Sequence, residues 1–206
     1  MRFDPFSFDI QQDPYPAYTW LRDEAPVYHV EEHDLWVLSR YEDVKTVIRD
    51  WQTYSNRDGV DIDKTDSLLV PGHMDEKDGR EHDVYRRLLQ PWFSPKLFQQ
   101  NLAGPIREET GRLVRELVAA GSGDITEIVA WQLPTFVVAR MFDLPEELRP
   151  ELLACMKPVF ARRPDAPVPP AESFEAGEKI MSLCRGVIAE RRRQGSEGRD
   201  DVISML

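Results

Sequence analysis

The stretch 78–95 constrains the fold of this chain more than any other part of the sequence. Asp78 and Glu81 stand three residues apart, the spacing of a capping box, and this predicts the start of a helix. Pro91 limits how far a regular helix can continue, and Pro95 ends it. Between these points, apolar residues at helical spacing predict a face that is buried against a core. The residues of this apolar face are Val84, Leu88 and Leu89.

A second face of the same predicted helix carries a histidine and an arginine. His82 and Arg86 lie four residues apart, so their side chains are expected one turn apart on the same side. Arginine stays charged at ordinary pH and offers a forked set of donors, and histidine adds one or two N–H donors. A carboxylate between them would accept charge-assisted hydrogen bonds from both. The spacing also allows a plainer interpretation, in which His82 pairs with a neighbouring acidic residue and Arg86 faces water.

The residues around this pair resemble the helix-C signature of the cytochrome P-450 family, the haem-thiolate monooxygenases, of the bacterial soluble type. That signature reads D-P-P-x-H-x-x-x-R, followed by apolar residues and then F-[ST]-P. In the family, the histidine and arginine of this motif bind a haem propionate, so the resemblance implies that role for His82 and Arg86. The matching residues here are Asp78, His82, Arg86, Phe93, Ser94 and Pro95.

One part of the signature is different in this sequence. Gly79 and Arg80 occupy the positions of the family's two prolines. Without the fixed backbone angle of proline, the entry to the helix is expected to be less rigid. The register of His82 and Arg86 against a haem is then less firmly set by the sequence.

The N-terminal part of the chain predicts helices and a small sheet. A first helix is expected after Asp13-Pro14, where prolines are tolerated. Val27–Val30 and Leu35–Leu38 are short strand-like runs joined by four polar residues, which predicts a hairpin. Ser39 and Glu42 have the spacing of a capping box for the next helix. This order resembles the start of the P-450 family, where D-P-Y-P, two strands and R-Y-D-D-V follow one another.

The stretch 59–77 has no regular period and is predicted to be a long loop with one helical turn. In the family, the loop between helices B and C covers the substrate and is the most variable part. The resemblance therefore implies that apolar residues of this stretch line a pocket. An alternative is that they only pin the loop to the core. The candidates are Leu68, Leu69, Val70 and Met74.

The C-terminal part is predicted to be helical. The predicted helices span 106–120, 125–142, 145–160 and 174–193, and another begins near Asp200. The inward face of the first is predicted to hold Ile106, Leu113, Val114, Leu117 and Val118.

Two segments near the end of the chain have a simple physical explanation. The segment 162–171 contains four prolines, so no regular helix can persist there. It resembles the family's F–G segment, a lid that moves when substrate enters. The run Arg191 to Arg193 lies at the end of the last long helix, where cations favour the helix dipole, and this accounts for the run without any ligand.

Composition argues against several classes of function. The net charge of −11 makes nucleic acid an improbable partner. No apolar run is long enough to span a bilayer, and the N-terminus lacks the apolar core of a signal peptide. Two cysteines are too few for a disulfide scaffold and fit a reducing compartment. We therefore predict a soluble cytoplasmic protein that binds neither membranes nor nucleic acid.

The resemblance covers residues 1–206 but only the N-terminal half of the family. The chain is accordingly interpreted as the N-terminal half of a single haem-thiolate monooxygenase domain. Its helix C motif lies at 78–95, its B–C loop at 59–77 and its F–G segment at 162–171. The implied fold class is mainly α with a small β-sheet, a P-450-like fold over the region of helices A to H.

Neither cysteine has the glycine-rich approach that the family's iron ligand requires. Cys155 and Cys184 lie within predicted helices and are expected to be structural thiols. The resemblance places the cysteine ligand, together with the oxygen-activating residues, in the missing half. We therefore expect the natural protein to continue beyond Leu206, and this stretch alone to be inactive.

The resemblance implies a monooxygenase that uses haem b, O2 and electrons from a ferredoxin-type donor to insert one oxygen atom into a small apolar organic substrate. His82 and Arg86 would fix the orientation of the haem without taking part in the chemistry. Arg87 is a candidate for the face that docks the electron donor, and a merely solvated arginine is the alternative. The competing hypothesis is a non-catalytic helical binding protein that keeps the fold without a haem.

Overall fold

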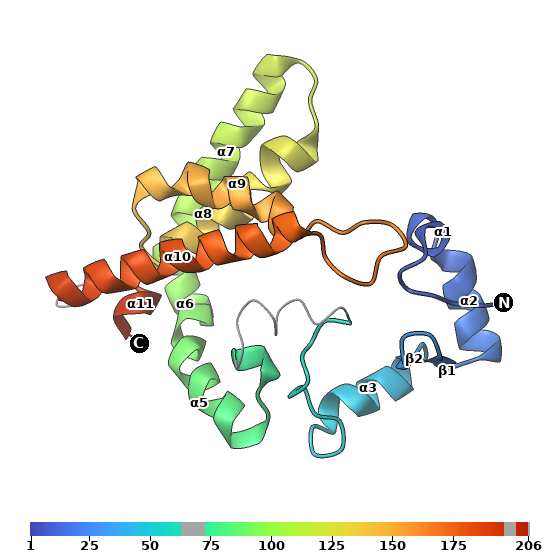
Figure 1. The fold of residues 1–206 in the computed structure, drawn as a ribbon. Helices are drawn as coiled ribbons and strands as arrows, with labels where there is room; N and C mark the ends of the chain where they lie inside the picture. Colours follow the sequence, from blue (N-terminus) through green and yellow to red (C-terminus); the bar gives the residue numbers. More distant parts are fainter. Residues whose placement is uncertain (63–72, 196–200, 206) are drawn as a thin grey trace. The chain divides into compact units, whose positions relative to one another are not determined.

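The computed structural model of the chain describes residues 1–62, 73–195 and 201–205 (Figure 1). This described part consists mainly of helices and has one two-stranded sheet, which confirms the predicted fold class. Within these ranges, none of the helices has the length and apolar character needed to cross a lipid bilayer.

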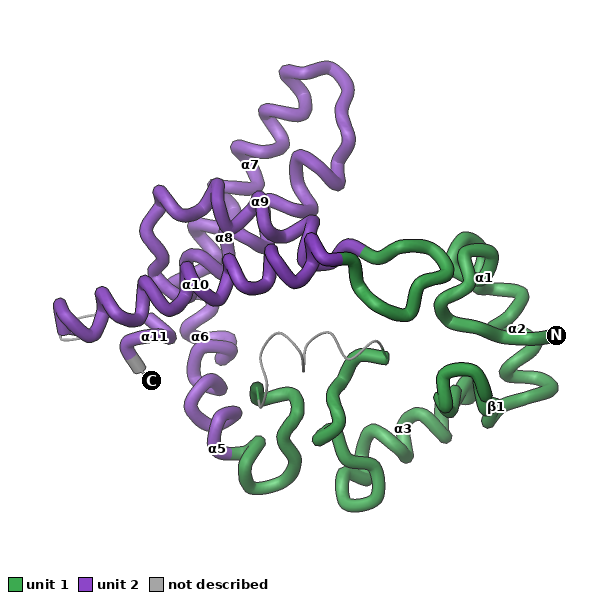
Figure 2. The backbone as a smooth tube through the Cα atoms, viewed as in Figure 1, with its two compact units in different colours: residues 1–83, 162–170 green, residues 84–161, 171–206 purple. Residues whose placement is uncertain are grey.

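The chain divides into two compact units (Figure 2). The first comprises residues 1–83 and 162–170, and the second comprises residues 84–161 and 171–206. The division falls within one helix, α5 (Gly79–Leu89).

The first unit is organised around the hairpin and the N-terminal helices. Its elements are α1 (Phe8–Gln12), α2 (Tyr15–Glu24), β1 (Val27–Val30), β2 (Leu35–Leu38), α3 (Tyr41–Arg49) and a 3-10 turn over Met74–Glu76. The strands are antiparallel, with Val27 opposite Leu38 and Val30 opposite Leu35, which confirms the predicted hairpin. Leu21 of α2 and Val30 of β1 are buried in one apolar cluster with Phe3 and Ala17.

The capping box predicted for α3 is wrong. The residue before the helix is Arg40, and its side chain makes no capping hydrogen bond. Ser39 belongs instead to the end of the hairpin, because its backbone N–H donates to the carbonyl oxygen of Pro26 at 3.2 Å. Its hydroxyl donates to the same oxygen at 3.4 Å. Ser39 is therefore bonded to Pro26 just beyond the last strand pair, and Arg40 stands at the cap position of α3.

Residues 162–170 return to the first unit without a regular helix, as the prolines predicted. Asp165 fastens this segment to the N-terminus. Its N–H donates to the carbonyl oxygen of Phe6 at 3.0 Å, and its Oδ1 accepts from the N–H of Phe8 at 2.9 Å. The backbone of Asp165 has a φ of +58°, in the left-handed region that aspartate tolerates better than most residues.

The second unit is helical. After α5, its elements are a 3-10 turn (Gln90–Phe93), α6 (Pro95–Leu97), a π-helical turn (Phe98–Leu102), α7 (Ala103–Ala120), a π-helical turn (Thr126–Ala130), α8 (Gln132–Met141), a 3-10 turn (Glu146–Leu148), α9 (Arg149–Val159), α10 (Ala171–Gln194) and α11 (Val202–Met205). α10 packs along α9 (Figure 1). Trp92, Leu102, Met141 and Val202 form the buried apolar cluster of this unit.

The helix predicted over 125–142 is interrupted, and the interruption comes before Pro134. A π-helical turn over Thr126–Ala130 ends at Trp131, and α8 starts at the next residue. Pro134 then lies in the first turn of α8, where a missing N–H leaves no intrahelical bond unmade. The proline is therefore accommodated without a bend inside α8.

The buried face predicted for α7 is only partly correct. Leu113 is completely buried, and Ile106 packs against the apolar cluster of the unit. Val114 and Val118 are 46% and 73% exposed. The inward face of α7 runs through Ile106, Glu109 and Leu113. It therefore includes a charged residue, Glu109, which the apolar pattern did not place there.

The buried Glu109 carboxylate is held by two arginines. Arg112 donates to both carboxylate oxygens at 2.9 Å and 3.0 Å, and Arg149 at the start of α9 donates to Oε1. Arg149 also lies 4.9 Å above the centre of the Phe136 ring. Hydrogen bonds from Arg112 and then Arg149 lower the pKa of Glu109 to about 2, although burial opposes this shift. The ion pair of Glu109 with Arg149 joins α7 to α9.

Glu109→Gln is expected to remove a part of the stability that depends on pH. Because the folded pKa is about 2 and the ordinary value is 4.5, the ionised carboxylate stabilises the fold above pH 4.5 and is lost toward pH 2. A shift of this size corresponds to at most about 3 kcal/mol, since each pKa unit is about 1.4 kcal/mol. Denaturant unfolding at a series of pH values should show a shallower loss of stability on acidification in the variant. Glu116→Gln is the matched control, because Glu116 also pairs with Arg112 but is half-exposed. Equal acid profiles for wild type and Glu109→Gln would contradict this assignment.

The dipole explanation for the arginine run is wrong for Arg191. This side chain is buried, and its guanidinium donates to Asp143 Oδ2 at 3.2 Å and to the Asp143 carbonyl oxygen at 3.2 Å. Its Nη1 lies 3.5 Å from Oδ2 of Asp201, which is 1% exposed. Asp201 also accepts from the N–H and hydroxyl of Ser204, at 3.0 Å and 2.6 Å, and so caps α11. The arginine thus anchors α11 to the end of α10.

Candidate functional site

His82 and Arg86 both lie in α5, as predicted, with the four-residue spacing of one helical turn. The His82 side chain is 32% exposed, and its Nδ1 lies 3.7 Å from Oδ1 of Asp83. Arg86 is exposed, and in the described part of the chain no carboxylate lies within ion-pair distance of its guanidinium. These positions agree with the plainer interpretation of the pair. They also leave the Arg86 donors available to an anion from outside the chain.

The entry to α5 is held by the carboxylate of Asp78, which is buried. Asp78 Oδ2 accepts a hydrogen bond from the hydroxyl of Ser55, and Oδ1 accepts from the N–H of Asn56 at 3.2 Å. Arg57 Nε lies 3.7 Å from Oδ2. The Ser55 hydrogen bond, followed by the Asn56 N–H, lowers the pKa of Asp78. Sequence reasoning missed this link, because the partners are 23 residues apart and no local pattern joins them.

The backbone at Gly79 explains why the first proline of the family signature is missing here. Its φ is +51°, whereas the proline ring fixes φ near −65°. A Cβ atom at this position would lie 2.8 Å from two carbon atoms of the Trp51 ring. The backbone of Gly79 therefore turns in the left-handed region directly beneath an indole, which only glycine does without strain.

Gly79→Ala is expected to lower the free energy of unfolding by about 1–2 kcal/mol, since a left-handed L-residue costs about this much. The shift of the Trp51 ring adds to the cost. Gly186→Ala in α10 is the matched control, because no heavy atom lies within 4 Å of its added Cβ. That substitution should raise stability by about 0.5–1 kcal/mol. Denaturant unfolding compares the two variants, and a neutral or stabilising Gly79→Ala would contradict the account of Gly79.

The residues that follow α5 are arranged by packing and capping. Trp92 is 4% exposed within the apolar cluster of the second unit, whereas Phe93 is 68% exposed. Ser94 accepts a hydrogen bond from the N–H of Leu97 at 3.3 Å and caps α6, with Pro95 as its first residue. The serine and proline of the F-[ST]-P motif therefore start the next helix.

The apolar face predicted for α5 is largely wrong. Val84 is 46% exposed and Leu88 is 41% exposed, and only Leu89 packs against the apolar cluster of the second unit. The contacts with the apolar cluster are made by Leu89, a member of the predicted face, and by Trp92, which follows α5.

The predicted pocket residues are not brought together by the described structure. Leu68, Leu69 and Val70 lie outside the described residues. Met74 is half-buried in the 3-10 turn Met74–Glu76. A substrate-lining role for these four residues stays a prediction.

Within the second unit, the described residues line an open cavity of about 880 Å³ that was not predicted from the sequence. It lies among α8, α9 and α10, and most of its wall is apolar. Cys184 and Arg191 also border it, and burial raises the pKa of the Cys184 thiol. Representative lining residues are Trp131, Val138, Phe142, Met156, Ile180 and Ile188.

Comparison with curated proteins and solved structures finds relatives that match nearly the whole chain. No protein-family model matches the chain. Cytochrome P450 130 of Mycobacterium tuberculosis is 31% identical over 204 residues, covering 94% of this chain and 49% of that protein. The epothilone C/D epoxidase of Sorangium cellulosum is 28% identical over 221 residues, covering 99% of this chain and 51% of the relative. The solved structure of cytochrome P450 PksS from Bacillus subtilis superposes with a TM-score of 0.78 at 23% identity, over 99% of this chain and 51% of that one.

The chain belongs to the cytochrome P-450 family. This confirms the resemblance that the helix-C residues indicated. The chain spans about half the length of the curated P-450 relatives it matches. A second solved structure, P-450 CYP109Q5 from Chondromyces apiculatus, gives the same extent, with a TM-score of 0.76 over 99% of this chain and 50% of that one at 25% identity.

Proposed function

We propose that this chain is part of a haem-dependent monooxygenase that inserts one oxygen atom from O2 into an apolar organic substrate. The observation that carries the proposal is membership of the P-450 family along nearly the whole chain. Two relatives have names that state an oxygen insertion. One is the epothilone C/D epoxidase, and the other is the erythromycin C-12 hydroxylase of Saccharopolyspora erythraea, 26% identical over 186 residues.

We infer that His82 and Arg86 hold a propionate of the haem. Arg86 is exposed on α5 and has no acidic partner in the part of the chain that the structure describes. His82 precedes it by one turn and retains an exposed edge. Two cationic or N–H donors on one helical face fit a carboxylate, because charge-assisted hydrogen bonds are strong and arginine binds carboxylates bidentately. These residues would neutralise and orient the haem.

The haem b supplies the oxygen-activating chemistry when it is bound through a cysteine thiolate. We place that thiolate outside these residues. Cys155 is buried in α9, and Cys184 lies in α10 beside the apolar cavity. Burial raises the pKa of the Cys184 thiol and so disfavours the thiolate that a metal ligand requires. We expect the iron ligand in the part of the P-450 relatives that this chain does not cover.

Substrate contact is proposed for the stretch 59–77, through Leu68, Leu69, Val70 and Met74. Residues 162–170 are proposed to act as a lid. Asp165 holds this segment to the N-terminus by two hydrogen bonds, one to Phe6 and one from Phe8, whereas Pro169 and Pro170 at its end are buried. Breaking such exposed hydrogen bonds costs little compared with opening a packed core.

Arg87 is proposed to face the electron donor, for which a ferredoxin-type protein is the expected partner. The side chain is exposed, and no carboxylate within the described ranges pairs with it. An acidic donor would be attracted to this arginine, and such attraction mainly affects the rate of association. It should therefore weaken as ionic strength rises.

The experiment that tests the proposed function is spectroscopic. The protein is produced from its complete natural coding sequence, reduced and exposed to carbon monoxide. The red-shifted Soret band of a thiolate-ligated haem is the expected result. A protein purified without haem, and unable to take it up, would contradict the proposal. It would favour the alternative, a non-catalytic helical binding protein built on the same fold.

A further inference from the structure

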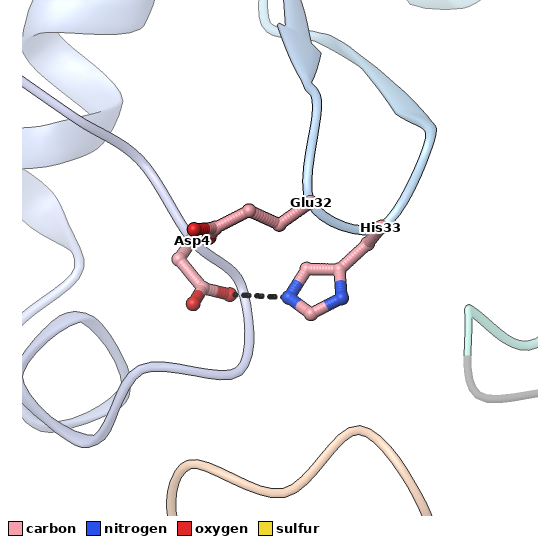
Figure 3. Close-up of side chains that lie close together, drawn as sticks. All are labelled: Asp4, Glu32 and His33. Atoms are coloured by element: carbon pink, nitrogen blue, oxygen red, sulfur yellow. Dashed lines mark ion pairs between the residues drawn. The ribbon is translucent and has the colours of Figure 1, made fainter.

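Three potential metal-ligating side chains meet in the first unit, where the N-terminal segment lies against the β1–β2 turn. They are Asp4, Glu32 and His33 (Figure 3). One ligand atom from each lies within 4.8 Å of the others. The His33 ring and the Asp4 carboxylate point toward each other, with Nε2 and Oδ1 3.4 Å apart.

Two of the three side chains are held in place by the fold. Asp4 Oδ1 accepts the N–H of Phe6 at 2.9 Å. The His33 ring packs edge-on against the Phe6 ring, with 4.7 Å between the ring centres. The turn itself is fixed by a hydrogen bond from the N–H of His33 to the carbonyl oxygen of Val30, at 3.2 Å. Phe6 thus positions both Asp4 and His33.

We propose that Asp4, Glu32 and His33 bind a divalent transition-metal ion of the zinc type, with water completing the coordination. Two carboxylate oxygens and one imidazole nitrogen are ligands that Zn²⁺ accepts. With metal–ligand bonds of about 2.0–2.2 Å, ligand atoms lie about 3–4 Å apart, and the Asp4–His33 pair already has such a separation. Glu32 would complete the set, since its ligand atom lies within 4.8 Å of the other two and its side chain is 53% exposed.

The competing contact of Glu32 is weak. Its carboxylate pairs with Arg2, and both side chains are more than half exposed. Exposed ion pairs contribute little to stability, so a doubly charged ion would displace the arginine readily. The metal would then join the N-terminal segment to the hairpin and stabilise the folded first unit by mass action. None of these residues belongs to the proposed haem site.

The test is calorimetric titration of the chelator-treated, tag-free protein with Zn²⁺, and with Mg²⁺ for comparison. One Zn²⁺ should bind per chain, whereas Mg²⁺ should not, because it prefers octahedral oxygen ligands. His33→Asn and Glu32→Gln should each weaken Zn²⁺ binding by about tenfold or more, a loss of about 1.4 kcal/mol. The melting temperature should rise with Zn²⁺ in the wild type and in neither variant.

The same hairpin provides the control. His29 Nε2 lies 2.9 Å from Asp34 Oδ1, so this pair resembles the site, but among the described residues no third ligand joins it. His29→Asn should leave Zn²⁺ binding unchanged. Wild-type protein that binds no Zn²⁺, a Glu32→Gln variant that binds it normally, or loss of binding in His29→Asn would each overturn the proposal. Glu32 is exposed, so its variant is expected to fold and the result remains decisive.

Discussion

Replacing Arg86 by alanine is expected to strip the holoprotein of much of its haem. The proposed propionate contact is a charge-assisted hydrogen bond, which contributes about 1.5–3 kcal/mol. Its loss should weaken haem binding by about tenfold to a hundredfold. Haem content after gel filtration, and the rate of haem transfer to an acceptor globin, measure this directly. Arg86→Lys keeps the charge but not the fork, so it should fall between wild type and alanine.

Arg87→Ala is the matched control on the same helix. Arg87 is also exposed, but its proposed role is to dock the electron donor. This variant should keep its haem and be reduced more slowly, and the difference from wild type should shrink as salt is added. Unchanged haem retention in Arg86→Ala would refute the propionate assignment while leaving the family relationship intact. Equal haem loss in both variants would show a general effect of charge on α5 rather than a specific site.

Arg191→Met is expected to be the most destabilising single substitution within the second unit that we consider. It leaves Asp201, 1% exposed, as a buried carboxylate without its cation. Breaking a buried ion pair by removing one partner costs about 3–5 kcal/mol. The Ser204 hydrogen bonds to Asp201 remain, so the lower end of this range is expected. Denaturant unfolding gives the free-energy difference.

Two further variants separate charge from packing in this network. Arg193→Ala removes an exposed arginine of the same run and should change stability by about 0.5 kcal/mol or less. Adding Asp201→Asn to Arg191→Met removes the orphaned charge and should restore part of the loss. A double variant no more stable than Arg191→Met would show that lost packing around the guanidinium, and not the buried charge, is responsible.

Local patterns in the sequence predicted most of the secondary structure. The hairpin of Val27–Val30 and Leu35–Leu38 followed from two short apolar runs and a polar connection, because a short connection brings adjacent strands into register. The irregular segment 162–170 followed from its prolines. The position of His82 and Arg86 on one helix followed from their spacing. These features depend on contacts between near neighbours in the chain.

The errors in the sequence analysis have a common origin. Apolar periodicity identified α7 as amphipathic but could not show that Glu109 would be buried, because Arg149 lies 40 residues away. The predicted cap at Ser39 was wrong because Ser39 is hydrogen-bonded to Pro26, 13 residues earlier in the chain. Each of these outcomes is decided by a partner that a local window does not contain.

Residue patterns were enough to indicate the family, most of the order of helices and strands, and the helix that carries His82 and Arg86. Contacts between distant parts of the chain were needed to show that Gly79 turns left-handed beneath Trp51, that Arg191 is buried between Asp143 and Asp201, and that Asp4 meets His33. The physical reason is that helices and hairpins are stabilised by groups a few residues apart. Buried charges, in contrast, are tolerated only where folding brings a distant partner within reach.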